Sequence, residues 1–125
     1  MSGRQILLVE DNEKNMKLLR DVLQAAGYRT LEATSGRQAV DTSIAHRPDL
    51  VLMDVHLPDI DGVEALRLLR ADARTAGMRV LAVTAQAMDG DRDRFLEAGF
   101  DAYLSKPVNI TELLATVRHH CDQSR

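Results

Sequence analysis

The sequence is poor in cysteine and in aromatic residues. Its 125 residues include one cysteine, no tryptophan, two tyrosines and two phenylalanines. The single Cys121 excludes an internal disulfide and a zinc site built on cysteines, and it is typical of a protein from a reducing compartment. So few rings argue against a base-stacking platform. A formal net charge of -3 also argues against a nucleic-acid binder, because such proteins need basic patches for the phosphates.

Long hydrophobic runs are also absent. No apolar stretch approaches the roughly 20 residues of a membrane span. Residues 6–9 are apolar, but the run is too short for a signal peptide and ends at Glu10. We therefore expect a cytoplasmic protein with no membrane segment. Its length predicts a single domain over residues 1–125 with no output domain, and 45% hydrophobic residues place it among globular chains.

The apolar pattern alternates between two kinds. Short continuous runs occupy residues 6–9, 50–53 and 80–83, with weaker strand candidates at residues 28–33 and 102–104. Continuous hydrophobicity indicates strands that are covered on both faces, as in a parallel sheet. Strands that alternate with helices, joined by short connections, predict a doubly wound α/β fold with five parallel strands.

Five helices are expected between and after these strands. Apolar residues recur at helical spacing in five sets: Met16, Leu19, Leu23 and Ala26; Ala39, Val40 and Ile44; Val63, Leu66 and Leu69; Phe95, Leu96 and Ala98; and Ile110, Leu113, Leu114 and Val117. Thr34 or Ser35 is expected to cap the second helix, and Asn109 the fifth. Gly27 and Gly99 are expected to end the first and fourth helices.

Chemically active side chains follow these strands. Ligands of such a sheet lie beyond the carboxyl ends of its strands. Glu10 and Asp11 follow the first strand, Asp54 the third, Thr84 the fourth and Lys106 the fifth. Carboxylates gathered without thiolates suit a hard cation such as Mg²⁺, and a lysine can face a phosphate as a point charge. The set therefore predicts phosphoryl transfer to a strand-end carboxylate.

Four segments resemble the receiver domain of two-component response regulators: residues 8–12, 52–62, 83–85 and 105–107. The spacing of Asp54, Pro58 and Gly62, followed by the Lys106–Pro107 pair, is specific for that family, and the resemblance covers nearly the whole chain. Residues 10–18 are similar to stand-alone bacterial receivers of the DivK kind. The resemblance implies a flavodoxin-like strand order, 2-1-3-4-5. Residues 58–62 are expected to form a turn and a helix start, with no chemical role.

The resemblance also implies residue roles. Asp54 would accept a phosphoryl group from a phosphohistidine. Glu10, Asp11, Asp54 and the backbone carbonyl of His56 would hold Mg²⁺, with Glu10 bound directly or through water. Lys106 would pair with an oxygen of the aspartate or phosphate. The protein would be no enzyme toward other substrates, and would catalyse only its own Mg²⁺-dependent phosphorylation and dephosphorylation.

A conformational switch and two kinds of partner are implied as well. Thr84 would bind the phosphate, Tyr103 would change rotamer with it, and Pro107 would follow a cis peptide bond. A sensor histidine kinase or a histidine phosphotransfer protein would supply the phosphate and dock near Asn15, Leu18 and Leu19. A downstream protein would bind a surface formed by residues 89–98, 102–104 and 110–120.

Three alternatives stay open at this point. An aspartate-based phosphatase also uses a strand-end nucleophile, but it needs a second aspartate two positions later, where this sequence has His56. A flavodoxin-like cofactor binder needs a phosphate-cradling loop after the first strand, which the sequence lacks. A receiver that signals without phosphate is disfavoured because every site position fits the family pattern.

Overall fold

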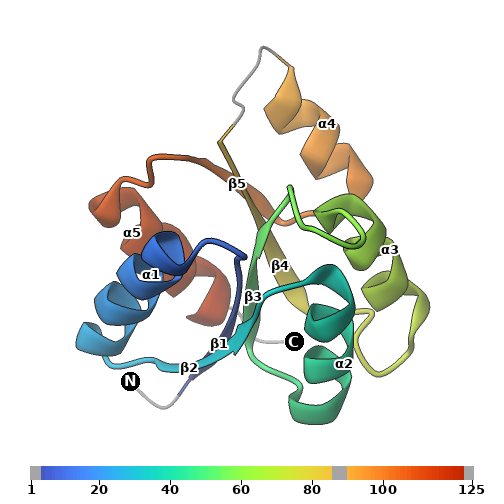
Figure 1. The fold of residues 1–125 in the computed structure, drawn as a ribbon, viewed down its shortest axis with the longest axis horizontal. Coiled ribbons are helices and arrows are strands. Elements are labelled where there is room, and N and C mark those ends of the chain that lie inside the picture. Colours follow the sequence, from blue (N-terminus) through green and yellow to red (C-terminus); the bar gives the residue numbers. More distant parts are fainter. Residues whose placement is uncertain (1–3, 86–89, 123–125) are drawn as a thin grey trace.

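The protein is an α/β fold in which a parallel sheet separates two layers of helices (Figure 1). A computed structural model describes residues 4–85 and 90–122. The strands are β1 (Gln5–Val9), β2 (Arg29–Ala33), β3 (Leu50–Asp54), β4 (Arg79–Thr84) and β5 (Ala102–Ser105); the helices are α1 (Glu13–Ala25), α2 (Gly36–His46), α3 (Gly62–Ala71), α4 (Asp91–Ala98) and α5 (Ile110–Asp122). The sheet order is β2-β1-β3-β4-β5, all parallel, so the predicted fold and strand order are confirmed. None of the helices described has the length and apolar character needed to cross a bilayer.

Each face of the sheet has its own core. Helices α1 and α5 cover one face, and α2, α3 and α4 cover the other (Figure 1). Within β1, Ile6 and Leu8 belong to the first core, whereas Leu7 and Val9 belong to the second. All five residues of β3 are buried. Burial on both faces explains why these strands read as continuous apolar runs.

Five residues of the predicted helical stripes are exposed rather than buried: Ala26, Val63, Leu96, Ala98 and Ile110. Met16, Leu19 and Leu23 are buried as predicted, but Ala26 is the exposed C-cap of α1. In α3, Val63 is 37% exposed and Ala65 is buried instead. The buried stripe of α3 begins at Gly62, one position before Val63, so Val63 faces outward by about 100° of helical rotation.

The predicted helix caps are confirmed. The side chain of Ser35 accepts a hydrogen bond from the Gln38 N–H at 3.1 Å, and Asn109 accepts one from the Glu112 N–H at 2.9 Å. Gly99 ends α4 with a φ of 116°, a left-handed conformation that glycine adopts without steric cost. These local signals set where the helices begin and end, and hence the lengths of the loops that carry polar residues.

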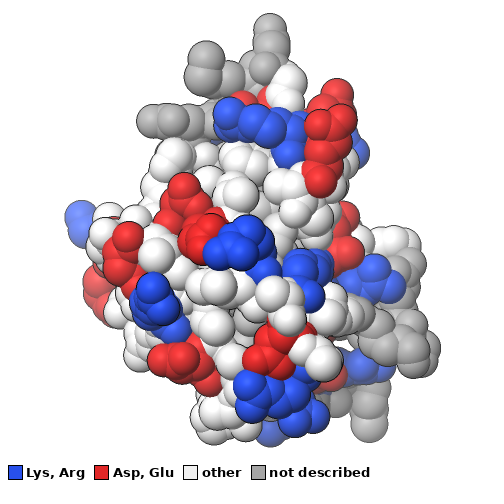
Figure 2. All heavy atoms as spheres, turned by 90° about the vertical axis from the view of Figure 1, so that its right-hand side faces the viewer, with Lys and Arg blue, Asp and Glu red and all other residues white. Residues whose placement is uncertain are grey.

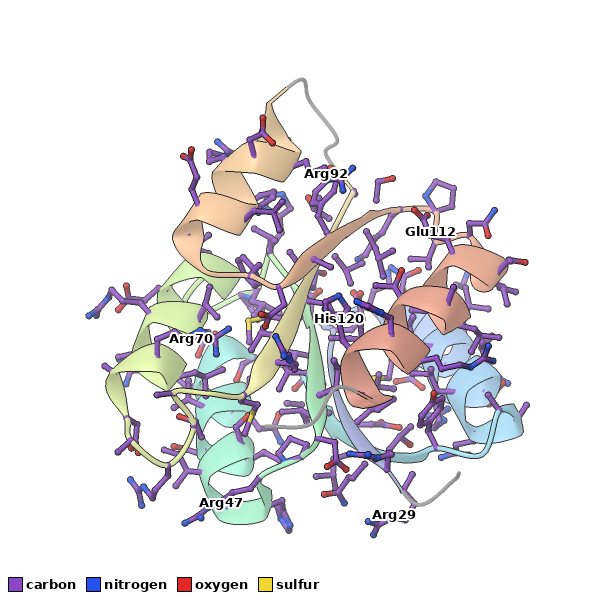
Figure 3. All side chains as sticks on the ribbon, turned by 180° about the vertical axis from the view of Figure 1, so that it is seen from behind. Arg29, Arg47, Arg70, Arg92, Glu112 and His120 are labelled. Atoms are coloured by element: carbon purple, nitrogen blue, oxygen red, sulfur yellow. The ribbon has the colours of Figure 1, made fainter. Side chains whose placement is uncertain are left out.

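A half-buried arginine joins several elements at the amino edge of the sheet. Arg70, near the end of α3, donates to the carbonyls of Ala76, Met78 and Gly99 at 3.1, 2.5 and 2.9 Å. Arg70, labelled in Figure 3, also donates to the Asp101 carboxylate at 3.2 Å. Asp101 in turn accepts from the backbone N–H at the second residue of β4. One guanidinium thus links α3, the loop before β4, the end of α4 and the residue preceding β5.

Replacing Arg70 is expected to destabilise the fold more than replacing its neighbour Arg67 on the same helix. Arg70→Ala removes the guanidinium donor of three backbone carbonyls and one of the donors of the Asp101 carboxylate, so the free energy of unfolding should fall by about 2 kcal/mol. Arg67 is exposed and pairs with its helix neighbour Glu64, so Arg67→Ala should cost about 0.5 kcal/mol or less. Urea denaturation of both variants measures the difference, and equal losses would contradict the structural role of Arg70.

Candidate functional site

Three carboxylates meet at the carboxyl edge of the sheet. Glu10 follows β1, Asp11 comes next in the chain, and Asp54 ends β3, the strand that pairs with β1. One oxygen from each of the three lies within 4.8 Å of the others. Glu10 and Asp54 are only 2% and 5% exposed, whereas Asp11 is exposed to solvent. The predicted convergence of these side chains is therefore present, and the cluster is open on the side of Asp11.

Lys106 lies between the two buried carboxylates. Its Nζ donates to Glu10 Oε1 at 2.7 Å and to Asp54 Oδ2 at 3.1 Å. Asp54 Oδ1 accepts from the His56 N–H at 2.9 Å, and Glu10 Oε2 accepts from the Asn12 N–H at 3.1 Å. Each buried carboxylate therefore has one oxygen bound by the backbone and the other by the ammonium group. This arrangement fixes the direction of both side chains.

The backbone around Lys106 is tied to the neighbouring strand. The Lys106 N–H donates to the carbonyl oxygen of Thr84, the last residue of β4, at 2.8 Å. The Lys106–Pro107 peptide bond is cis, as predicted. Lys106 is the third of only three lysines in a chain with thirteen arginines. A flexible lysine suits this place because its compact ammonium group can face two carboxylates at once.

Burial and mutual repulsion shape the titration of the cluster. Burial raises the pKa of Glu10, the hydrogen bond from Lys106 opposes this rise, and the charge of Asp54 adds to it. Burial would lower the pKa of Lys106, but its hydrogen bonds to Glu10 and Asp54 raise that pKa overall. Lys106 therefore stays protonated at neutral pH. Three carboxylates and one ammonium group leave two negative charges uncompensated when all four are ionised, a donor set that fits a divalent cation.

Thr84 and Tyr103 lie in two different grooves. Thr84 is fully buried at the end of β4 and lines a groove of about 470 Å³ together with Val55, His56 and Phe95. Tyr103 of β5 lines a second groove of about 410 Å³ between α4 and α5. The ring of Phe95 stacks on Tyr103 with centroids 5.7 Å apart. Tyr103 thus lies outside the carboxylate cluster, and Phe95, which the sequence analysis did not single out as a site residue, connects the two grooves.

Asp59, in the loop after β3, makes a contact with the start of α2. Its carboxylate oxygens accept hydrogen bonds from the N–H groups of Gly36 and Arg37 at 2.8 and 3.0 Å. These partners lie 23 and 22 positions earlier in the chain, so no local sequence pattern reveals the contact. Asp61, in the same loop, accepts from the Glu64 N–H and caps α3. The loop after β3 therefore begins one helix and caps another.

Comparison with known families and relatives gives a consistent result. The family described as "Response regulator receiver domain" matches residues 6–118. The polar-differentiation response regulators DivK of Brucella anthropi and Brucella ovis are each 42% identical to this chain over 117 residues. In both comparisons the match covers 94% of this chain and 95% of the relative.

Solved structures similar to this chain belong to the same kind of protein. The receiver domain of sensor histidine kinase PA1611 from Pseudomonas aeruginosa is 38% identical, with a TM-score of 0.90. The match covers 98% of this chain and all of that domain, whose structure has a magnesium ion coordinated in the active-site cleft. A response regulator from Chloroflexus aurantiacus is 32% identical with a TM-score of 0.91, and the match covers 96% of this chain and 98% of that one.

Removing the ammonium group is expected to change how stability depends on pH. In Lys106→Ala, Glu10 and Asp54 face each other without a cation, so the pKa of Glu10 should rise further. The native state then binds more protons than the unfolded chain above the ordinary Glu10 pKa of 4.5, and the free energy of unfolding falls as pH rises through that window. At pH values above the native pKa, each further unit by which the Glu10 pKa rises lowers the free energy of unfolding by about 1.4 kcal/mol.

Urea denaturation from pH 4.5 to pH 8, with a chelator present, measures this effect. Lys17→Ala is the matched control, because Lys17 is exposed and pairs with Asp21 on the surface of α1. The Lys106 variant should lose stability more steeply than the wild type over this range, and the Lys17 variant should follow the wild type. Parallel curves for all three proteins would contradict the proposed coupling.

Proposed function

Because the chain belongs to the response regulator receiver domain family and serves as a phosphoacceptor in two-component signalling, we propose that Asp54 takes the phosphoryl group. The observation that carries this proposal is the Lys106 ammonium group, which binds Asp54 Oδ2 beside two further carboxylates. A carboxylate oxygen of Asp54 would attack the phosphorus of a partner's phosphohistidine. The P–N bond then breaks, the histidine nitrogen keeps the electron pair, and an acyl phosphate forms on Asp54.

We propose Mg²⁺ as the cation of this site. The donor set consists of carboxylate oxygens from Glu10, Asp11 and Asp54, which Mg²⁺ prefers over softer ligands. The carbonyl of His56 would complete the protein ligands. When bound, Mg²⁺ supplies positive charge against the oxygens of the incoming phosphoryl group. The magnesium ion in the cleft of the Pseudomonas receiver supports this assignment.

We propose that a sensor histidine kinase or a histidine phosphotransfer protein supplies the phosphate. A small groove of about 90 Å³ lies beside Glu10 and Lys106, between α1 and the residues after β5. Its apolar lining includes Leu18, which is 43% exposed, together with Pro107 and Val108. A helix of the donor resting there would bring its histidine toward Asp54. The phosphohistidine of such a donor forms at the expense of ATP in the cytoplasm. The protein would therefore act in the cytoplasm.

The groove between α4 and α5 is the proposed surface for the downstream partner. Arg92 of α4 and Glu112 and His120 of α5 lie around it with Tyr103 of β5 (Figure 3). We propose that Thr84 binds the phosphate and that Tyr103 moves in response, with Phe95 transmitting the change. A shift from 1:99 to 99:1 between two states needs about 5.5 kcal/mol of differential stabilisation. Of the predicted surface, residue 89 lies outside the described residues.

The surface charge supports a protein partner over a nucleic acid. On the face of the molecule that α3 and α4 form, basic and acidic side chains alternate (Figure 2). Their pairing is local: Arg67 with Glu64, Arg74 with Asp72, and Arg94 with Asp91. Such a face lacks the continuous positive field that phosphate backbones require.

We propose turnover of its own acyl phosphate as the protein's only catalytic activity.

Asp54→Asn is expected to abolish phosphorylation. The wild type, incubated with acetyl phosphate and Mg²⁺, should gain the mass of one phosphoryl group. The amide that replaces the carboxylate is a poor nucleophile, so the variant should gain nothing. Asp41→Asn, at an exposed position of α2, is the matched control and should gain the group like the wild type. Intact-mass spectrometry gives the answer, and a phosphorylated Asp54→Asn protein would overturn the assignment of Asp54.

Mg²⁺ is expected to stabilise the protein through Asp11. A ligand at ten times its Kd adds about 1.4 kcal/mol to the free energy of unfolding, which raises the Tm of a domain of this size by about 5 °C. Asp11→Asn removes an exposed carboxylate and should lose most of this shift. Glu13→Gln, a nearby exposed change in α1, should keep it. Calorimetry with and without Mg²⁺ tests this, and an unchanged shift in Asp11→Asn would remove Asp11 from the metal site.

A further inference from the structure

We propose that Asp59 is a positioning residue that ties the loop after β3 to the start of α2, and thereby holds the backbone of His56 in place for the metal. The inference rests on the proposed function, in which the His56 carbonyl is a metal ligand. Residues 58–62 were expected from the sequence to be only a turn and a helix start. The structure assigns them a second contact, on a different helix.

The carboxylate of Asp59 binds the amino end of α2. It accepts from the Gly36 N–H through Oδ1 at 2.8 Å and from the Arg37 N–H through Oδ2 at 3.0 Å. These are the first two residues of α2, whose N–H groups have no partner inside the helix. Ser35 already caps the same helix locally, through the Gln38 N–H. Asp59 therefore adds a second cap from a distant part of the chain, and this cap joins α2 to the loop.

The loop and α2 are also in close steric contact. A Cβ atom built on the buried Gly36 would lie 2.5 Å from Ile60 Cγ1 and 2.7 Å from the Ile60 carbonyl oxygen. Only glycine permits so close an approach at this position. Ile60 in turn packs against the core that α2 and α3 share. Two successive loop residues, Asp59 and Ile60, thus contact the start of α2, one by hydrogen bonds and the other by packing.

Further restraints act on the loop at its two ends and through Leu57, which packs against the same core. The Val55 N–H donates to the Val83 carbonyl at 3.0 Å, and the Gly62 N–H donates to the Val55 carbonyl at 2.8 Å. Between these points, His56 is exposed and donates its N–H to Asp54 Oδ1. The α2 contact adds hydrogen bonds to the middle of this segment, where Leu57 is held by apolar packing. Loss of that contact should let the His56 peptide move and weaken its hydrogen bond to Asp54.

The charge of Asp59 suits this role. Desolvation by the surrounding residues would raise the pKa of Asp59, but the hydrogen bonds from the backbone N–H groups of Arg37, Ile60 and Gly36 together lower this pKa. The carboxylate is therefore ionised throughout the neutral range, and hydrogen bonds to an ionised acceptor are stronger than those to a neutral one. It also complements the positive end of the α2 dipole. The contact is thus present at neutral pH.

Hydrogen exchange of the His56 amide in the metal-free protein tests the inference directly. Asp59→Ala removes the remote cap, and Ser35→Ala, the matched control, removes the local cap of the same helix. Both variants should lose a similar amount of stability. Only Asp59→Ala should speed exchange of the His56 amide, by about 10-fold, because only that change frees the loop. Equal exchange in the two variants would reduce Asp59 to an ordinary helix cap and overturn the proposal.

Mg²⁺ titration of the same proteins, followed by amide chemical shifts, gives the second readout. Residues that orient metal ligands typically change metal affinity when removed, and Asp59→Ala should weaken Mg²⁺ binding by about 3- to 10-fold. Ser35→Ala should leave it unchanged. Gly36→Ala pushes Ile60 away without altering any charge, so it should weaken binding as well. Normal binding by Gly36→Ala and weak binding by Asp59→Ala would indicate a charge effect and contradict a positioning role.

The two proposals fail in different ways. If the wild type binds no Mg²⁺, the proposed metal site is wrong, and the metal-dependent part of the inference fails with it. In that case, the exchange of the His56 amide still decides whether Asp59 holds the loop. If the wild type binds Mg²⁺ and Asp59→Ala binds it equally well with unchanged exchange, the proposed function stands and the role of Asp59 is refuted.

Discussion

The arrangement of charges at the carboxyl edge of the sheet depends on the hydrogen bonds from the Lys106 ammonium group to Glu10 and Asp54. Glu10 and Asp54 are buried at the ends of two paired strands, where two carboxylates would repel each other at short range. Lys106 comes from the loop after β5 and compensates one of the charges. Because the strands are parallel, the residues that follow β1, β3 and β5 lie at the same edge of the sheet. The remaining negative charge makes that edge receptive to a cation.

The two edges of the sheet are organised differently. The carboxyl edge gathers ionisable side chains whose loops are held by backbone hydrogen bonds, such as that from the Lys106 N–H to Thr84. At the amino edge, Arg70 and Asp101 join α3, the end of α4, the start of β4 and the residue that precedes β5. Between the edges, two apolar cores hold the strands rigidly. The charged cluster is thus supported by apolar packing on both faces of the sheet.

Sequence patterns predicted the elements better than their faces. Continuous apolar runs identified β1, β3 and β4, because strands buried on both faces carry no alternation to misread. Helical spacing located α1 and α3 but assigned Ala26 and Val63 to their buried stripes. Both residues lie in the end turns, where neighbouring positions fit the same spacing and where the approach of other elements decides which one is covered.

The sequence alone determined the fold class, the strand ends and the identity of the residues that meet there, because hydrophobic periodicity and the rule for parallel sheets are local or topological. Tertiary structure decided which of those residues touch. Lys106 binds Glu10 across 96 positions of chain and Asp54 across 52, with the Glu10 contact the shorter. Asp59 caps a helix that precedes it in the chain, and Arg70 binds two separate segments, residues 76–78 and 99–101. Such contacts depend on how closely packed elements approach, and no pattern within one segment records that distance.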